Sequence, residues 1–257
     1  MRKSILALLA LALVLALGGS AFAAKDTLVV ADQYDATTFD PIRHNDYPSS
    51  RACHQVYDTL IFLNDDGTFR PGLAEKWEFV SDTAYKMTLR KGVKFHNGEE
   101  LKAEDVKFSL ERATTDLGAH IKTYSQDLDS VEVLDDYTVV LHLKKVNFPF
   151  FASLAHSWGS IVNKKEVEAQ GENYGTPAGT AVGTGPFKFV SWQKSDRYTL
   201  ERFDDKFKIM LSEHFFDELL VILAFGFERD RDISIAVLQA RREAVVVDFH
   251  DIGICDL

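Results

Sequence analysis

The sequence predicts a mixed α/β fold of the α+β kind, in which antiparallel hairpins dominate. Short β-branched and aromatic runs come in pairs that are separated by tight polar turns. Helical patterns fall between them without the strict strand–helix–strand alternation of a parallel sheet. An apolar content of 46%, with 19 Phe residues, suffices for a substantial core.

The N-terminus has the features of a secretory signal peptide. Arg2 and Lys3 precede the uncharged apolar run 5–17, and the small residues at 21 and 23 fit an A-x-A cleavage site. The run is about 13 residues, short of the ~20 that a membrane-spanning helix needs. We therefore expect a signal peptide over 1–23 and a soluble periplasmic protein. No Cys follows the run, so we expect no lipid anchor.

Charge and motifs exclude several classes of function. The chain has 29 basic and 39 acidic side chains, and without Arg2 and Lys3 the balance is 27 − 39 = −12. Nucleic acid is not an expected partner, because phosphate neutralisation needs clustered Lys and Arg. G-x-S-x-G, H-E-x-x-H and C-x-x-C are all absent from the sequence. We expect no catalytic residues, no cofactor and no metal, and a secreted hydrolase is the weakest alternative.

Strands are predicted in chain order from short apolar runs and from alternation with period two. Tyr85, Met87 and Leu89 alternate with polar residues, which places one face in the core and one in water. Polar turns at 81–82, 135–136 and 194–196 join three hairpins. The expected strands are 27–31, 60–63, 77–80, 85–89, 131–134, 137–143, 161–162, 187–192 and 198–203.

Four helices are predicted. The first starts at a Ser49 or Ser50 cap and runs to about 59. In the second, 103–113, Val106, Leu110 and Ala113 share one face. Two short helices follow at 148–154 and 164–169, and the Gly- and Thr-rich segment 171–184 is a predicted loop.

Some conspicuous residues are interpreted as structural. His96 lies in a turn and has no second metal ligand at a suitable spacing. The segment Gly183-Thr184-Gly185 lacks the Lys-Ser/Thr of a phosphate loop, so it predicts a tight turn. Cys53 is expected to be a buried thiol, and its pairing with Cys255 is left open.

Ordered sequence pieces identify a family. The block 72–109 reads GLAEKWEFVSDTAYKMTLRKGVKFHNGEELKAEDVKFS. Its order and spacing, with those of the flanking pieces, resemble the peptide-binding proteins of bacterial ABC importers, that is, extracellular solute-binding proteins of family 5. The pieces are FDP (39–41), VYDTL (56–60), LAEKW (73–77), LRKGVKFHNG (89–98), AEDVKFS (103–109) and GTGPF (183–187).

The resemblance implies a periplasmic binding protein type II-like lobe with an inserted β-rich subdomain. Residues 24–42 and 160–257 would form an incomplete lobe I, and 43–159 the inserted α+β subdomain. The second large lobe of the family is expected to be missing from this chain, since the resemblance weakens after about 207.

The resemblance also implies where a ligand binds. In such proteins the segment after the first strand and the segment crossing between lobes reach the ligand. On this basis the expected substrate-binding residues are Asp35, Ala36, His156, Ser157 and Trp158, with Asp35 approaching a peptide and His156 meeting a peptide carboxylate.

The implied function is that of a non-catalytic importer component. It would be a monomer that binds di- or oligopeptides and works with the membrane permease subunits of an ABC transporter. Nickel-chelate, sugar or haem carriage stays open, because those ligands would use the missing half. A truncated, inactive chain, or an interaction or chaperone-like periplasmic module, is the alternative class.

Overall fold

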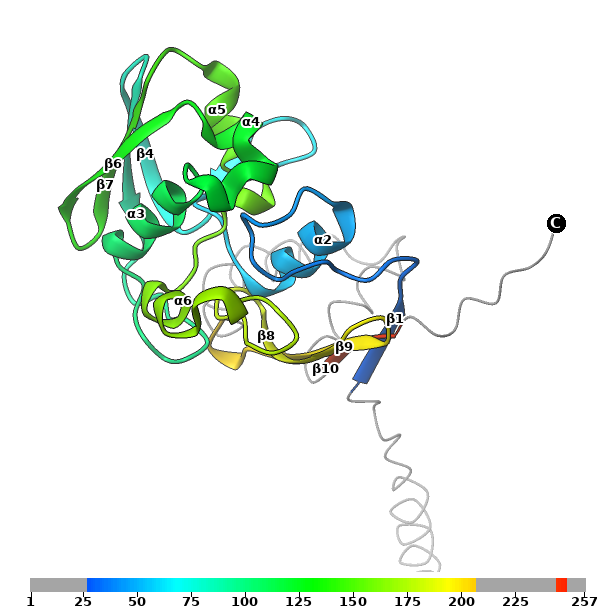
Figure 1. Ribbon diagram of the computed structural model, residues 1–257. Coiled ribbons are helices and arrows are strands. Elements are labelled where there is room, and N and C mark those ends of the chain that lie inside the picture. Colours follow the sequence, from blue (N-terminus) through cyan, green and yellow to red (C-terminus); the bar gives the residue numbers. More distant parts are fainter. Residues whose placement is uncertain (1–26, 207–243, 249–257) are drawn as a thin grey trace, which may run out of the picture.

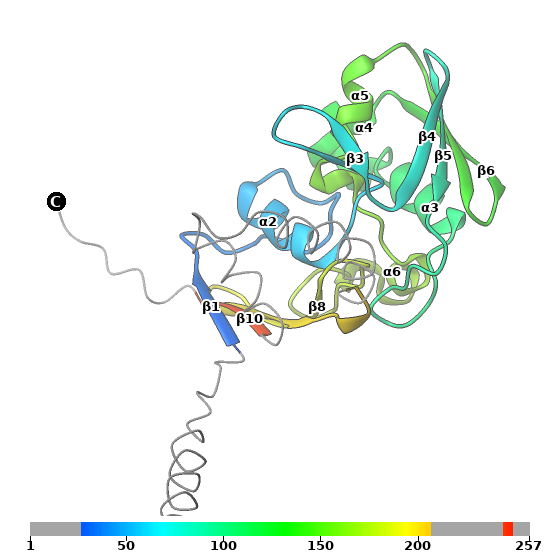
Figure 2. The same ribbon diagram turned by 180° about the vertical axis from the view of Figure 1, so that it is seen from behind.

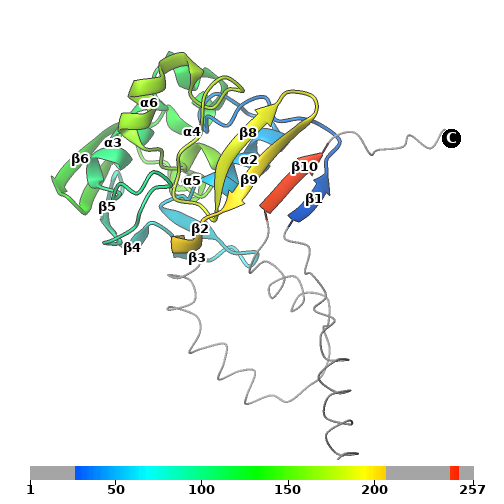
Figure 3. The same cartoon turned by 90° about the horizontal axis from the view of Figure 1, so that it is seen from below.

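The computed structural model describes residues 27–206 and 244–248, and the predicted signal peptide and Cys255 lie outside these ranges. One four-stranded sheet has the order β1-β10-β9-β8 (Figure 3). β1 (Thr27–Ala31) pairs in parallel with β10 (Ala244–Asp248), while β9 (Arg197–Arg202) and β8 (Phe187–Gln193) form the predicted hairpin. The parallel pair was not predicted, because its strands are far apart in the sequence.

A second four-stranded sheet, with the order β4-β5-β7-β6, is antiparallel throughout. It contains β4 (Ala74–Ser81), β5 (Ala84–Leu89), β6 (Leu128–Asp135) and β7 (Thr138–Leu143). β2 (Ile61–Leu63) and β3 (Phe69–Pro71) form a separate two-stranded ribbon. Tyr85, Met87 and Leu89 are buried, which confirms the predicted period of two.

Helices cover both sheets (Figures 1 and 2). α3 (Ala103–Arg112) lies against β6 and β7, and α2 (Tyr47–Val56) lies against β8. α5 (Phe148–Ser153) and α6 (Lys164–Gln170) match the two short predicted helices. The remaining helical segments are α4 (Lys122–Ser125), η1 (Asp116–Ile121), η2 (Ser157–Gly159) and η3 (Gly171–Asn173).

Two local predictions were wrong. The cap of α2 is Asp46, whose side chain accepts a hydrogen bond from the Ser49 backbone N–H, and the helix ends at Val56 rather than near 59. Ile161 and Val162 form no strand, because each is buried in a different core. Only their neighbour Ser160 makes an isolated bridge, to Thr59.

The described residues contain two hydrophobic cores. The larger core lies between the β4–β7 sheet and helices α3 and α5, and includes Met87, Leu110 and Trp158. The smaller core lies beneath the β8–β9 hairpin and includes Phe39 and Trp192. The buried residues of α2 belong to the smaller core. The division into lobe I (24–42 and 160–257) and an inserted subdomain (43–159) remains a prediction. That prediction assigns α2 to the inserted subdomain, whereas α2 packs in the smaller core with the β8–β9 hairpin.

The Gly183–Gly185 turn fits the prediction of a structural role. A Cβ atom on Gly183 would lie 2.2 Å from the Val56 carbonyl oxygen, and one on Gly185 would lie 2.5 Å from the Val56 carbonyl carbon. The Gly185 N–H donates to the same carbonyl oxygen at 2.9 Å. Both glycines are therefore needed because the turn approaches the end of α2 closely.

We expect Gly185→Ala to lower the free energy of unfolding by about 1–3 kcal/mol, since backbone must move to admit the new methyl group. Urea unfolding followed by tryptophan fluorescence measures this change. Ala178→Ser, at an exposed position before the turn, is the control and should alter stability little. Equal stability of Gly185→Ala and the unmodified chain would contradict the close approach.

Candidate functional site

Asp35 and Ala36 lie where the chain leaves β1. The Asp35 carboxylate accepts hydrogen bonds from the Trp192 indole N–H at 3.1 Å and from the Ser195 backbone N–H at 2.7 Å. Ser195 adopts a left-handed φ of 63° in the β8–β9 turn. Ala36 is buried in the smaller core. Asp35 thus ties the segment after β1 to the β8–β9 hairpin, and it is only partly accessible.

His156, Ser157 and Trp158 lie at the end of the α5 segment. The half-buried His156 ring stacks on Tyr124, with ring centroids 5.1 Å apart, and Nδ1 lies 3.4 Å from the Ser157 hydroxyl. Trp158 is 0% exposed and packs on Phe150. No hydrogen bond, ion pair or ring contact between described residues joins this group to Asp35.

The structure adds two histidines that sequence reasoning missed. His44 precedes α2, His54 lies on α2, and both are within electrostatic reach of His156. Desolvation lowers the pKa of His44 and His54, and the nearby His156 lowers both further. Desolvation also lowers the pKa of His156. The three rings are therefore neutral at pH 7, and their spacing in the sequence gave no sign that they would meet.

Two buried nitrogen atoms in this region have no hydrogen-bond partner among the described residues. They are Nδ1 of His44, a residue that is 3% exposed, and the indole Nε1 of Trp158. A buried polar atom without a partner is costly, so such atoms are frequently found where a ligand or water completes the site. The His44 Nε2 atom lies 3.5 Å from the Cys53 sulfur.

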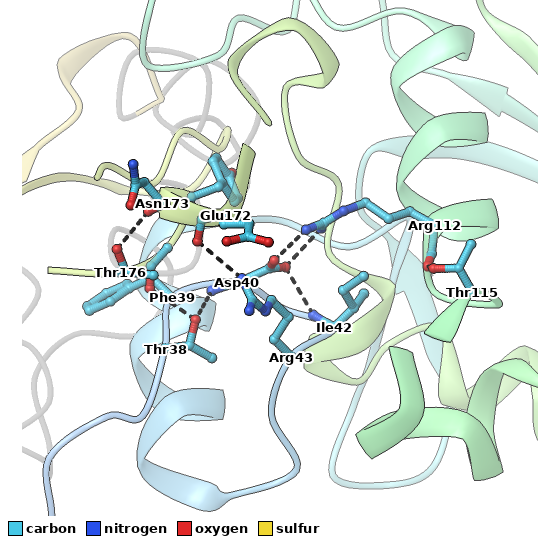
Figure 4. Close-up of polar contacts among 12 residues, drawn as sticks. Thr38, Phe39, Asp40, Ile42, Arg43, Arg112, Thr115, Glu172, Asn173 and Thr176 are labelled. Atoms are coloured by element: carbon cyan, nitrogen blue, oxygen red, sulfur yellow. Dashed lines mark hydrogen bonds and ion pairs between the residues drawn. The ribbon is translucent and has the colours of Figure 1, made fainter. Parts of the chain in front are cut away.

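A buried ion pair links the end of α3 to the loop between β1 and α2. The Arg112 guanidinium, at the end of α3, makes a two-pronged contact with Asp40, with Nη1 to Oδ1 at 2.9 Å and Nη2 on Oδ2 (Figure 4). Asp40 is 0% exposed. Its backbone N–H donates to the Thr38 hydroxyl, and that hydroxyl donates to the Gly175 carbonyl oxygen. This pair joins α3 to the loop after β1.

A cavity of about 570 Å³ adjoins this ion pair. Phe108, Leu117 and Val167 form its apolar wall. The polar lining comes from Arg43, Glu111, Arg112, Thr115, Gly171 and Glu172. It is separate from the five predicted substrate-binding residues, none of which lines it.

Residues 27–206 and 244–248 contain neither a metal-binding cluster nor a membrane-spanning helix. No group of three or more His, Cys, Asp or Glu side chains there is arranged to hold a metal ion. No helix in those ranges combines the length and apolar character needed to cross a bilayer.

Comparison with known proteins identifies the family. A model of the family described as bacterial extracellular solute-binding proteins, family 5, middle region, matches residues 68–213, more than half of the chain. The chain belongs to this family. The match includes the 72–109 block, from β4 to α3, on which the sequence resemblance was based.

Curated relatives agree with this assignment. The glutathione-binding protein GsiB of Shigella dysenteriae is 34% identical over 200 residues, covering 76% of this chain and 38% of the relative. GsiB of Escherichia coli gives the same identity and coverage. The chain therefore spans well under half the length of the curated relatives that it matches.

Solved structures have the same fold. The periplasmic binding protein DppA of Helicobacter pylori, in complex with the peptide STSA, is 27% identical with a TM-score of 0.65, covering 87% of this chain and 42% of that one. The oligopeptide-binding protein AppA of Bacillus subtilis, in complex with a nonapeptide, is 27% identical with a TM-score of 0.63, covering 71% and 37%. The periplasmic binding protein-like fold is thus shown.

Proposed function

We propose that this chain is a periplasmic solute-binding component of an ABC importer that binds peptides and delivers them to membrane permease subunits. The observation that carries the proposal is family membership together with relatives named for glutathione and structures solved with peptides. Glutathione is itself a tripeptide, so peptides are the ligand class that these relatives share. The chain acts by recognition and carries out no reaction.

The proposed binding residues are Asp35, Ala36, His156, Ser157 and Trp158. Support is strongest around His156, where Nδ1 faces Ser157 while Nε2 has no partner among the described residues. A neutral imidazole with a free Nε2–H donates a hydrogen bond to a carboxylate or a peptide carbonyl. The unpartnered indole N–H of Trp158 offers a further donor nearby. Asp35 has hydrogen bonds within the protein, so its proposed part includes holding the segment in place.

The test is calorimetric titration of the full chain with glutathione, dipeptides and tri- to pentapeptides. We expect His156→Ala to weaken peptide binding roughly tenfold or more, since a buried hydrogen bond to a charged group is worth about 1.5–3 kcal/mol. Asp35→Ala should also weaken binding, with a measurable loss of stability. The double variant should bind no more tightly than either single one.

The matched control is His142→Ala, at another half-buried histidine, which lies on β7 and pairs with Glu132. It should leave peptide affinity unchanged. Unaltered affinity in the Asp35→Ala/His156→Ala double variant would reject these residues as ligand contacts. Absence of any peptide binding, combined with self-association on size-exclusion chromatography, would instead favour an interaction or chaperone-like module.

A further inference from the structure

The cavity beside the Asp40–Arg112 pair has a ligand-binding character of its own. It lies between α3 and η1 on one side and α6 and η3 on the other, so elements of both cores line it. Its volume of about 570 Å³ falls within the range typical of small-molecule sites. None of the residues proposed to bind peptide contributes to it, so the inference does not rest on the proposed function.

The charged groups that line the cavity differ in whether they already have a partner within the protein. Arg112 is neutralised by Asp40. Glu111 receives the Val131 backbone N–H at 3.0 Å and pairs with Lys107 at 3.5 Å. These groups hold the protein together and have little capacity left for a ligand.

Arg43 and Glu172 are different. One Arg43 nitrogen donates to the Glu172 backbone carbonyl oxygen at 3.3 Å, which holds the two residues side by side. In the described part of the chain, however, the Glu172 carboxylate has no hydrogen-bond or ion-pair partner, and Arg43 makes no ion pair. Figure 4 shows both residues beside the Asp40–Arg112 pair. The cavity therefore carries one unpaired positive and one unpaired negative charge.

An apolar wall completes the arrangement. The partly buried Phe108 and the buried Val167 flank the interior, and Leu117 is 50% exposed. A guanidinium recognises a carboxylate through paired N–H donors, and a carboxylate recognises an ammonium group. A ligand that satisfies all three features has one negative charge, one positive charge and an apolar group.

We propose that this cavity is a second small-molecule site, which binds an apolar α-amino acid. Arg43 binds its carboxylate, Glu172 binds its ammonium group, and Phe108, Val167 and Leu117 contact its side chain. Because elements of both cores line the cavity, the bound amino acid also stabilises their packing against each other and raises the melting temperature of the chain.

The experiment titrates the full chain with L-leucine and L-phenylalanine by calorimetry. We expect binding that weakens roughly tenfold or more in Arg43→Gln and in Glu172→Gln, since each removes a charge-assisted contact. N-acetyl-leucine lacks the ammonium group and leucinamide lacks the carboxylate. Each should bind the unmodified chain about as weakly as leucine binds the two variants. Glu168→Gln, at an exposed position on α6 outside the cavity, is the matched control and should leave affinity unchanged.

Two further measurements separate this site from the proposed peptide site. The Asp35→Ala/His156→Ala variant should bind leucine as the unmodified chain does, and leucine should not displace a peptide. Failure of both amino acids to bind at millimolar concentration would overturn the proposal. So would leucine affinity in Arg43→Gln and Glu172→Gln that equals that of the unmodified chain, whatever the result for peptides.

Discussion

Replacing Arg112 with glutamine is expected to lower the free energy of unfolding by about 3–5 kcal/mol, because the change leaves the fully buried Asp40 carboxylate without its partner. Desolvating an unpaired charge costs far more than losing an exposed ion pair, which contributes about 0–1 kcal/mol. The loss should be visible as a lower urea midpoint in fluorescence-monitored unfolding of the full chain.

Two further variants give this prediction its control. Asp40→Asn/Arg112→Gln removes both charges, so it should recover part of the lost stability. Arg112→Lys keeps the positive charge but loses the two-pronged geometry, and it should fall between the unmodified chain and Arg112→Gln. The assigned role of the pair would be wrong if Arg112→Gln cost less than about 1 kcal/mol, the range of exposed pairs.

Acidification from pH 7 to about pH 4 is expected to destabilise the chain through His96. Nε2 of this ring lies 3.0 Å from the Gly185 carbonyl oxygen, and Nδ1 accepts from the Gly183 N–H at 3.3 Å, so the ring is neutral and protonated on Nε2. Burial lowers the pKa of His96 from 6.5 to about 4. These contacts hold the turn around His96, which precedes α3, against the Gly183–Gly185 segment.

Proton linkage determines whether stability rises or falls with pH. Between pH 6.5 and about 4 the unfolded chain binds a proton at His96 that the folded chain does not, so stability falls as the pH falls. The contribution is complete above the unfolded pKa of 6.5 and is lost as the pH reaches about 4. At about 1.4 kcal/mol per pKa unit, the loss amounts to about 3 kcal/mol.

Unfolding free energies measured at several pH values, for the unmodified chain and for His96→Gln, check this prediction. The difference between the two should shrink steadily from pH 7 to 4, while the exposed control His120→Gln should follow the unmodified chain. An NMR titration gives an independent reading, and a His96 midpoint near 6.5 would refute the assigned hydrogen bonds. His44, His54 and His156, whose pKa values are also lowered, add to the acid sensitivity of both chains equally.

Local patterns predicted the hairpins well, since each depends on residues close together in the chain. The β4–β5, β6–β7 and β8–β9 pairs formed where alternation and polar turns placed them. The same reasoning failed at Ile161 and Val162, where two adjacent apolar residues serve different cores rather than one strand. A short apolar run carries no information about which core will bury it.

The binding residues could be predicted only in part. The family resemblance selected Asp35 and His156, but it gave no indication that Asp35 binds Trp192 or that His44 and His54 lie near His156. The contact of Arg43 with the Glu172 backbone carbonyl, and the cavity beside it, were not predicted at all, since these residues are 129 positions apart. Spacing within the sequence cannot reveal side chains that meet only after folding.

The sequence by itself determined the fold class, the hairpins, the main helix α3 and the family, because these rest on local periodicity and on ordered motifs such as the 72–109 block. The tertiary structure alone decided the β1–β10 pairing. It alone also decided the ion pair between Asp40 and Arg112, two residues that lie 72 positions apart. The physical reason is that buried charges and parallel strands are stabilised by partners brought close by packing, and packing is a property of the whole chain.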